Sequence, residues 1–284
     1  MTEEGRTPPA GPDDQTGSAV LLTGGNEGIG YHLTKSLLES GHRVAVVDLN
    51  DSNLDALAGA FPDRLMVIRA DVTSDEQVAG AVQTVLSAWG SIDVVVNNAC
   101  LARFARFEDR TPEDIRREFE VNYFGYLRVI AAVLPSMKAR GKGVIHNVSS
   151  GVGLSGFPGI VGYASTKGAI EAMTRTLAIE FEPYGIRVNL IHPPLTNTKS
   201  AAPLGIPPQM MADPAAVGRK LARKIGSTKA VITPDLSAGL GLAMMRLFPG
   251  AFGRLLGKAA ARARDSREGG VGHRGSEGGA GSPD

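Results

Sequence analysis

Six short apolar runs, separated by longer amphipathic segments, constrain the fold of this 284-residue chain more than any other feature. Each run has at most eight residues and is rich in valine and isoleucine, as expected of strands buried on both faces of a sheet. The segments between them have helical spacing, for example residues 75–89 and 167–185. This alternation predicts right-handed βαβ units, and therefore an α/β fold with a doubly wound parallel sheet. The predicted strands are residues 19–23, 43–48, 64–71, 92–99, 143–150 and 186–191.

The chain is predicted to form one domain with polar ends. Residues 1–16 are acidic and proline-rich and lack the apolar core of a secretory signal, and residues 265–284 are glycine-rich; both are expected to be disordered tails. Residues 17–232 would form the domain, and residues 233–264 a basic, hydrophobic C-terminal extension. The single cysteine, Cys100, excludes an internal disulfide and a cysteine-based metal cluster. We therefore expect a reducing, cytoplasmic location and no metal site.

A glycine-rich turn, TGGNEGIG at residues 23–30, joins the first predicted strand to the first predicted helix. Such a turn lets backbone amides and the positive end of the helix face a phosphate group. Gly24 would permit the tight turn, and Gly28 and Gly30 would let a pyrophosphate and the sheet approach closely. Because the glycines can also serve only a turn, they indicate a dinucleotide site only together with other residues.

Asp48 ends the second predicted strand, eighteen residues after the glycine-rich turn. This is near the spacing at which an acid accepts the ribose hydroxyls of a dinucleotide. The alternative is that Asp48 caps the next helix, but residues 50–52 (Asn-Asp-Ser) can fill that role. A carboxylate repels a 2′-phosphate, and neither the turn nor the end of the strand carries a lysine or arginine to offset the repulsion. The pattern therefore predicts NAD rather than NADP as the cofactor.

Six motifs, in order, resemble the short-chain dehydrogenase/reductase family over residues 18–198. Ser150 precedes Tyr163 by thirteen residues, which is the spacing of the family. The resemblance implies a Rossmann fold and an oxidoreductase that transfers hydride between nicotinamide and an alcohol or ketone carbon. The motifs are the glycine-rich turn, ADV with Asp71, NNAC at residues 97–100, VNYFG with Asn122, VSS with Ser150, and YASTK with Tyr163 and Lys167.

The resemblance assigns catalysis to Asn122, Ser150, Tyr163 and Lys167. Tyr163 would act as general acid/base, and Ser150 would hydrogen-bond the substrate oxygen. Lys167 lies one helical turn after Tyr163, so its ammonium, together with the positive charge of the oxidised nicotinamide, would favour the phenolate. In the family, Asn122 fixes a water that links Lys167 to solvent. The presence of all four argues against a non-catalytic NAD-binding scaffold.

The resemblance also implies the cofactor and substrate contacts. Substrate contacts would come from Ser150, Phe157 and Tyr163. Cys100 replaces the last glycine of the family's Asn-Asn-Ala-Gly, and we expect it to be a small buried hydrophobe rather than a nucleophile. Pro194 replaces the glycine of the family's Pro-Gly. The predicted cofactor residues are Gly24, Asn26, Glu27, Gly28, Ile29, Gly30, Asp48, Leu49, Asp71, Val72, Asn98, Ala99, Tyr163, Lys167, Pro193, Thr196 and Thr198.

The C-terminal region leaves the substrate and the partners open. Residues 215–264 contain ten lysines or arginines and one acid, Asp235, interspersed with leucine and phenylalanine. With the sequence HPPLTNT at residues 192–198, this region resembles the 3-ketosphinganine reductases, which reduce a long-chain keto lipid at membranes. The main expectation remains an alcohol or ketone of unspecified kind, and a long-chain 3-keto lipid, of the 3-ketosphinganine or 3-oxoacyl type, is the alternative.

The basic segment itself has two interpretations. It can lie peripherally on an anionic membrane, or it can pack over the pocket or over a partner subunit. The composition of this segment does not favour nucleic-acid binding. Residues 215–264 contain only two aromatic residues, Phe248 and Phe252, and no recognition motif. Members of the family are usually homodimers or homotetramers, joined through the helices that carry Asn122 and Tyr163.

Overall fold

The computed structural model describes residues 17–255 and 257–258; the two predicted tails, residues 1–16 and 265–284, lie outside the described residues. Seven parallel strands form one sheet in the order β3-β2-β1-β4-β5-β6-β7. The order reverses between β1 and β4, and a crevice for a ligand is expected at the carboxyl ends of these strands. This topology confirms the predicted doubly wound Rossmann fold. The strands are β1 (Ala19–Thr23), β2 (Arg43–Asp48), β3 (Leu65–Arg69), β4 (Val94–Asn97), β5 (Gly143–Val148), β6 (Ile186–Ile191) and β7 (Val231–Ile232).

All six predicted strands form, but three of them end earlier than predicted. β3, β4 and β5 stop before the polar motifs that follow them, so that Asp71, Asn98 and Ser150 lie in loops at one edge of the sheet. β7 was not predicted, because a strand of two residues is too short to produce a recognisable apolar run.

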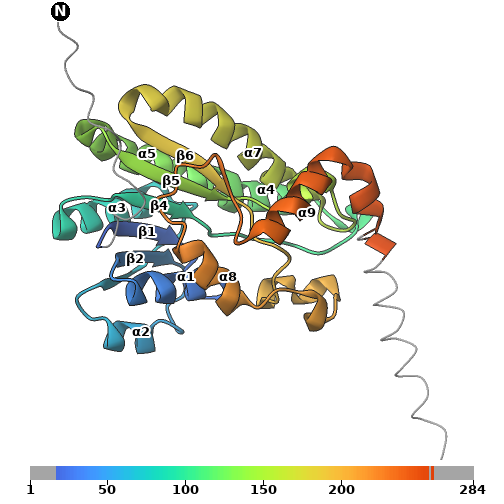
Figure 1. Ribbon diagram of the computed structural model, residues 1–284, viewed down its shortest axis with the longest axis horizontal. Helices are drawn as coiled ribbons and strands as arrows, with labels where there is room; N and C mark the ends of the chain where they lie inside the picture. Colours follow the sequence, from blue (N-terminus) through green and yellow to red (C-terminus); the bar gives the residue numbers. More distant parts are fainter. Residues whose placement is uncertain (1–16, 256, 259–284) are drawn as a thin grey trace, which may run out of the picture.

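Helices cover both faces of the sheet (Figure 1). Apolar side chains of α1, α2 and α8 pack on one face, and those of α3, α5 and α7 pack on the other. The helices are α1 (Gly28–Glu39), α2 (Asp55–Ala60), α3 (Asp75–Trp89), α4 (Pro112–Phe119), α5 (Gly125–Arg140), α6 (Val152–Ser155), α7 (Val161–Phe181), α8 (Pro214–Ala222) and α9 (Leu236–Leu247), with a π-helical turn, η2 (Glu120–Phe124), between α4 and α5. Short 3-10 turns are η1 (Phe107–Asp109), η3 (Glu182–Tyr184), η4 (Lys199–Leu204) and η5 (Pro208–Met210).

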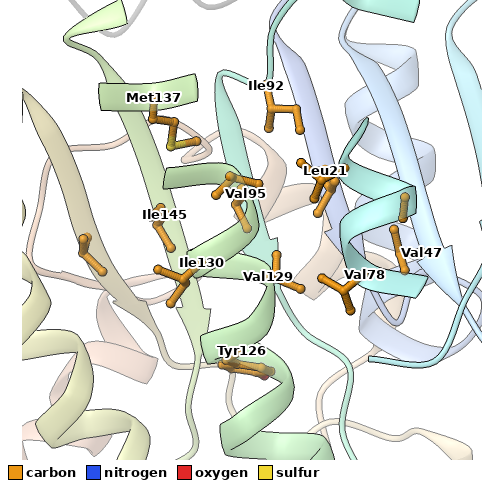
Figure 2. Close-up of a cluster of buried hydrophobic side chains, with 14 of the residues drawn as sticks. Leu21, Val47, Val78, Ile92, Val95, Tyr126, Val129, Ile130, Met137 and Ile145 are labelled. Atoms are coloured by element: carbon orange, nitrogen blue, oxygen red, sulfur yellow. The ribbon is translucent and has the colours of Figure 1, made fainter. Parts of the chain in front are cut away.

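The core beneath α5 holds in place the helix that follows the π-helical turn. Figure 2 shows Val129 and Ile130 of α5 lying over Val95 of β4 and Ile145 of β5, and all four side chains are buried. Burying an aliphatic side chain of this size stabilises the fold by about 1.5–3 kcal/mol. The start of α5, which follows Asn122, is therefore held firmly against the sheet.

The described part of the C-terminal extension packs on the domain. Its helix α9 contacts α6, and the sulfur of Met245 lies against Gly151. Residues 249–255 are also helical, and Gly253 lies against the backbone of Ser155. Figure 1 shows α9 and the 199–211 segment at the same end of the molecule. Within the described residues, every helix is too short or too polar to cross a bilayer.

Candidate active site

A cavity of about 800 Å³ opens at the carboxyl ends of the strands. All seventeen residues predicted to contact the cofactor line it, and so do Ser150 and Phe157. Asn122 is fully buried and is not part of the lining. The fold thus brings together predicted cofactor residues that are up to 174 positions apart in the chain, from Gly24 to Thr198.

The glycine-rich turn forms a close-fitting cradle at one end of the cavity. Gly24 has φ of +71°, a conformation that favours glycine. A side chain at Gly30 would overlap the carbonyl oxygen of Gly24, which accepts a hydrogen bond of 2.7 Å from Asn98 Nδ2. Glu27, the N-cap of α1, makes no side-chain bond to the first turn of the helix, so that turn's amides are available to a phosphate. The cradle therefore fits the pyrophosphate of a dinucleotide.

Asp48 lies beside this cradle and is hydrogen-bonded to it. Its carboxylate accepts hydrogen bonds from the amides of Asn26 (3.0 Å) and Asn50 (3.2 Å). The interpretation of residues 50–52 as a helix cap is wrong, because the N-cap of α2 is Leu54 and no side chain caps it.

The expectation that no basic residue adjoins Asp48 is also wrong, because a residue distant in the sequence lies next to it in the fold. Arg69 is the register partner of Asp48 on β3, and its Nε donates to the carbonyl of Leu49 at 3.1 Å. The parallel pairing of β2 with β3 creates this contact, which cannot be seen in the sequence around Asp48. Arg69 does not line the cavity itself, but Leu49, to which it bonds, does.

Three of the four predicted catalytic residues face the cavity: Ser150, Tyr163 and Lys167. The ammonium of Lys167 lies 5.5 Å from the centre of the Tyr163 ring and donates to the carbonyl of Val148 at 2.8 Å. Ser150 hydrogen-bonds the side chain of Tyr163. The one-turn spacing thus places the lysine next to the tyrosine, as predicted.

The protein's own groups act on the protonation state of Tyr163. Burial raises the pKa of its hydroxyl, the nearby Cys100 raises it further, and the hydrogen bond with Ser150 only partly offsets these effects. Burial also lowers the pKa of Lys167. The protein by itself therefore holds Tyr163 as a neutral phenol.

Asn122 acts behind the cavity rather than in it. Its carboxamide exchanges two hydrogen bonds with the backbone of Leu101 (2.7 and 2.8 Å) and donates to Thr166 Oγ1 at 3.1 Å. The side chain thereby joins the loop after β4 to α7, next to Lys167. The expected role of Asn122 in holding a water stays a prediction.

The prediction that Cys100 is buried is wrong. Cys100 is exposed to the cavity, although the protein around the cavity still raises the pKa of its thiol. Among the described residues only glycines have positive φ, so a cysteine replaces the family's glycine here without backbone strain. A raised pKa disfavours the thiolate, which agrees with the expectation that Cys100 is not a nucleophile.

Several lining residues were not predicted. His192 and Lys199 flank the predicted proline and threonine residues, and α9 contributes Leu242 and Met245. The position of Lys199 at the cavity has no local sequence signal. Packing of the C-terminal extension over the pocket was one of its two predicted arrangements, but the sequence did not indicate which of its residues would face the cavity.

Comparisons with known proteins agree with this geometry. A family model described as short chain dehydrogenase matches residues 18–207. The 3-alpha-(or 20-beta)-hydroxysteroid dehydrogenase of Mycobacterium bovis is 36% identical over 182 residues, which cover 64% of this chain and 70% of that protein.

Solved structures are similar in fold as well. A short-chain dehydrogenase from Streptomyces avermitilis has a TM-score of 0.71 and 28% identity, covering 90% of this chain and 98% of that one. A 3-ketoacyl-(acyl-carrier-protein) reductase from Brucella melitensis, solved with NADH, has a TM-score of 0.69 and 28% identity, covering 77% and 94%.

The fold, the cavity and these matches define an oxidoreductase with a nicotinamide cofactor. The chain belongs to the short-chain dehydrogenase family. It is an NAD(P)-dependent enzyme that acts on CH–OH and C=O groups.

Proposed function

We propose that the protein interconverts a bulky, neutral, apolar secondary alcohol and its ketone, with Tyr163 as general acid/base and NAD(H) as cofactor. The observation that supports this most directly is that Ser150, Tyr163 and Lys167 share one cavity with a cradle for a dinucleotide. When bound, the nicotinamide would supply or accept the hydride.

The protein's own groups would handle the proton and the oxygen. In reduction, the neutral phenol of Tyr163 donates its proton to the developing alkoxide, and Ser150 holds the oxygen by a hydrogen bond. Lys167 stabilises the phenolate that results, because an opposite charge nearby favours the ionised form. Asn122 keeps α7 and the loop after β4 in register through its bonds to Thr166 and Leu101.

The substrate class follows from the walls of the cavity. Its substrate side is lined by Phe104, Phe157, Leu204, Leu242 and Met245. Of the lining lysines, Lys167 belongs to the catalytic group and Lys199 pairs with Glu27 at 3.2 Å; among the described lining residues no further lysine or arginine is left to bind an anion.

The name of one relative supports a bulky, neutral substrate. The Mycobacterium bovis relative is named for a hydroxysteroid, a large and neutral alcohol, which supports this class. A long-chain keto lipid, of the 3-ketosphinganine or 3-oxoacyl type, is the alternative and would occupy the same apolar walls.

A turnover screen tests the proposal. Hydroxysteroids, long-chain 3-keto lipids and small cyclic ketones are offered with NAD(H) and with NADP(H). We expect turnover of the bulky apolar compounds, with kcat/KM favouring NAD(H), because Asp48 repels a 2′-phosphate. If none of these compounds is turned over with either NAD(H) or NADP(H), the proposed function is contradicted.

Two variants separate the charges that set the cofactor preference. Asp48→Ser removes the repulsion and leaves Arg69 free to pair with a 2′-phosphate, so kcat/KM for NADP(H) should rise about tenfold or more. In the matched double variant Asp48→Ser with Arg69→Ala, most of this gain should be absent. A wild-type preference for NADPH would overturn the argument from Asp48.

A second proposal concerns the outer face of α9. Leu236, Leu240, Leu247 and Phe248 expose their side chains on a segment whose other face lines the cavity. Arg254 and Lys258, both exposed, lie nearby in the chain. We propose that this face rests on an anionic membrane, since apolar burial and attraction to lipid charge act together there.

Co-sedimentation with anionic vesicles measures this binding. We expect the intact protein to pellet at low salt and to be released by salt, and Leu240→Asp with Leu247→Asp to remain in the supernatant. Point variants replace a truncation here, because removing α9 would also open the cavity.

Light scattering without vesicles gives the size of the assembly, for which we propose a homodimer or homotetramer. If the double variant loses only self-association, a second copy and not a membrane covers α9.

A further inference from the structure

A buried carboxylate lies where several segments of the active site meet. Glu171 is on α7, one turn after Lys167, and is 2% exposed. His192 Nε2, at the end of β6, lies 2.5 Å from Glu171 Oε1. Arg175 and Arg246 lie 3.0 and 3.6 Å from Glu171 Oε2.

Two of these partners adjoin residues that line the cavity. His192 immediately precedes Pro193 and itself lines the cavity. Arg246 follows Met245, whose sulfur packs against Gly151 next to Ser150. Arg175, in contrast, belongs to α7 itself and reaches back to Glu171 from the next turn. Glu171 therefore connects the helix that carries Tyr163 to the helix that walls the cavity.

The charge of Glu171 makes its partners necessary. Burial alone raises the pKa of Glu171, but His192, Ser149 and Arg246 together bring the pKa below its ordinary value. Glu171 is thus an anion inside the protein, and such a group requires cationic or hydrogen-bonding partners. Arg246 is the partner supplied by α9, and a second ion pair, between Lys220 and Asp235 (2.7 Å), holds the start of that helix to α8.

We propose that Glu171 is a positioning residue that fixes one wall of the cavity. Through its ion pair with Arg246 it holds α9, and with it Met245, at a fixed distance from Ser150. The consequence for turnover rests on the proposed function. The consequence for the helix does not, because α9 would be tethered whether or not a substrate is present.

Amide hydrogen exchange of α9 tests the tether directly. In Arg246→Ala, exchange in Leu236–Leu247 should rise about 2- to 5-fold, the range expected for a half-exposed ion pair. Exchange in the strands should stay unchanged. The KM for a bulky substrate should rise by a similar factor, while kcat and the affinity for the cofactor are retained, because Arg246 contacts neither the reacting atoms nor the cradle.

Three further variants identify the cause. Arg175→Ala removes a cation from the same carboxylate without touching α9, so exchange in α9 should stay at the wild-type rate. Arg246→Lys keeps the charge and should restore most of the protection. Glu171→Gln should reproduce Arg246→Ala, and the double variant should add little to either.

The outcomes are decisive even without a known substrate. Unchanged exchange of α9 in Arg246→Ala, or an equal increase in Arg175→Ala, would overturn the proposal. If Glu171→Gln does not fold, Arg246→Ala and Arg246→Lys still decide it. If no substrate is turned over but α9 is loosened as expected, the proposed function fails and the tether stands.

Discussion

Tyr163→Phe should lower turnover by at least ~100-fold, the smaller end of the effect of a general acid or base. The ring is kept and only the hydroxyl is lost, so the shape of the cavity and the cradle for the cofactor should not change. The residue lines the cavity beside Ser150 and is held as a neutral phenol. Removing it takes away the proton that reduction requires.

A second buried tyrosine provides a matched control for this variant. Tyr126 lies at a similar distance from Lys167, 5.6 Å, but does not line the cavity, and its hydroxyl donates to the carbonyl of Val148. Tyr126→Phe should lower the stability by about 1 kcal/mol and leave turnover within a few-fold. Steady-state rates and NAD(H) titrations of both variants are compared. Near-normal turnover by Tyr163→Phe would refute its role as acid/base.

The fold could be predicted because its signals are local. A buried parallel strand is a continuous apolar run, and six of the seven strands have one. The glycine-rich turn and the spacing of Tyr163 and Lys167 are also local, since one helical turn places both side chains on the same side of α7. Each of these patterns depends on residues that are neighbours in the chain, so the chain alone contains the information.

The parts of the site that were not predicted depend on contacts between distant segments. Arg69 adjoins Asp48 only because β3 pairs with β2 in one register. Met245 reaches Gly151 only because α9 packs across α6. Cys100 was expected to be buried because small apolar residues generally are, but it lies on the wall of a cavity that no local pattern describes. In each case the missing information is the position of one element relative to another.

Gly30→Ala should disrupt the cradle for the cofactor. The added methyl group would overlap the carbonyl oxygen of Gly24 and lie 2.7 Å from Asn98 Nδ2. Because a backbone carbonyl cannot rotate away as a flexible side chain can, the turn itself must move. We expect a loss of about 1–3 kcal/mol in the free energy of unfolding, as for other overpacked sites. The affinity for NAD(H) should fall about tenfold or more, since a loss of about 1.4 kcal/mol of binding energy suffices.

Gly80→Ala is the control that separates this clash from the general effect of replacing a glycine in a helix. Gly80 lies in the middle of α3, and a methyl group there would meet no atom within 4 Å. This variant should be more stable than the wild type by about 0.5–1 kcal/mol and should bind NAD(H) normally. Denaturant unfolding and cofactor titration are measured for both variants. If Gly30→Ala binds NAD(H) as tightly as Gly80→Ala, close contact between Gly24 and α1 is not what shapes the cofactor site.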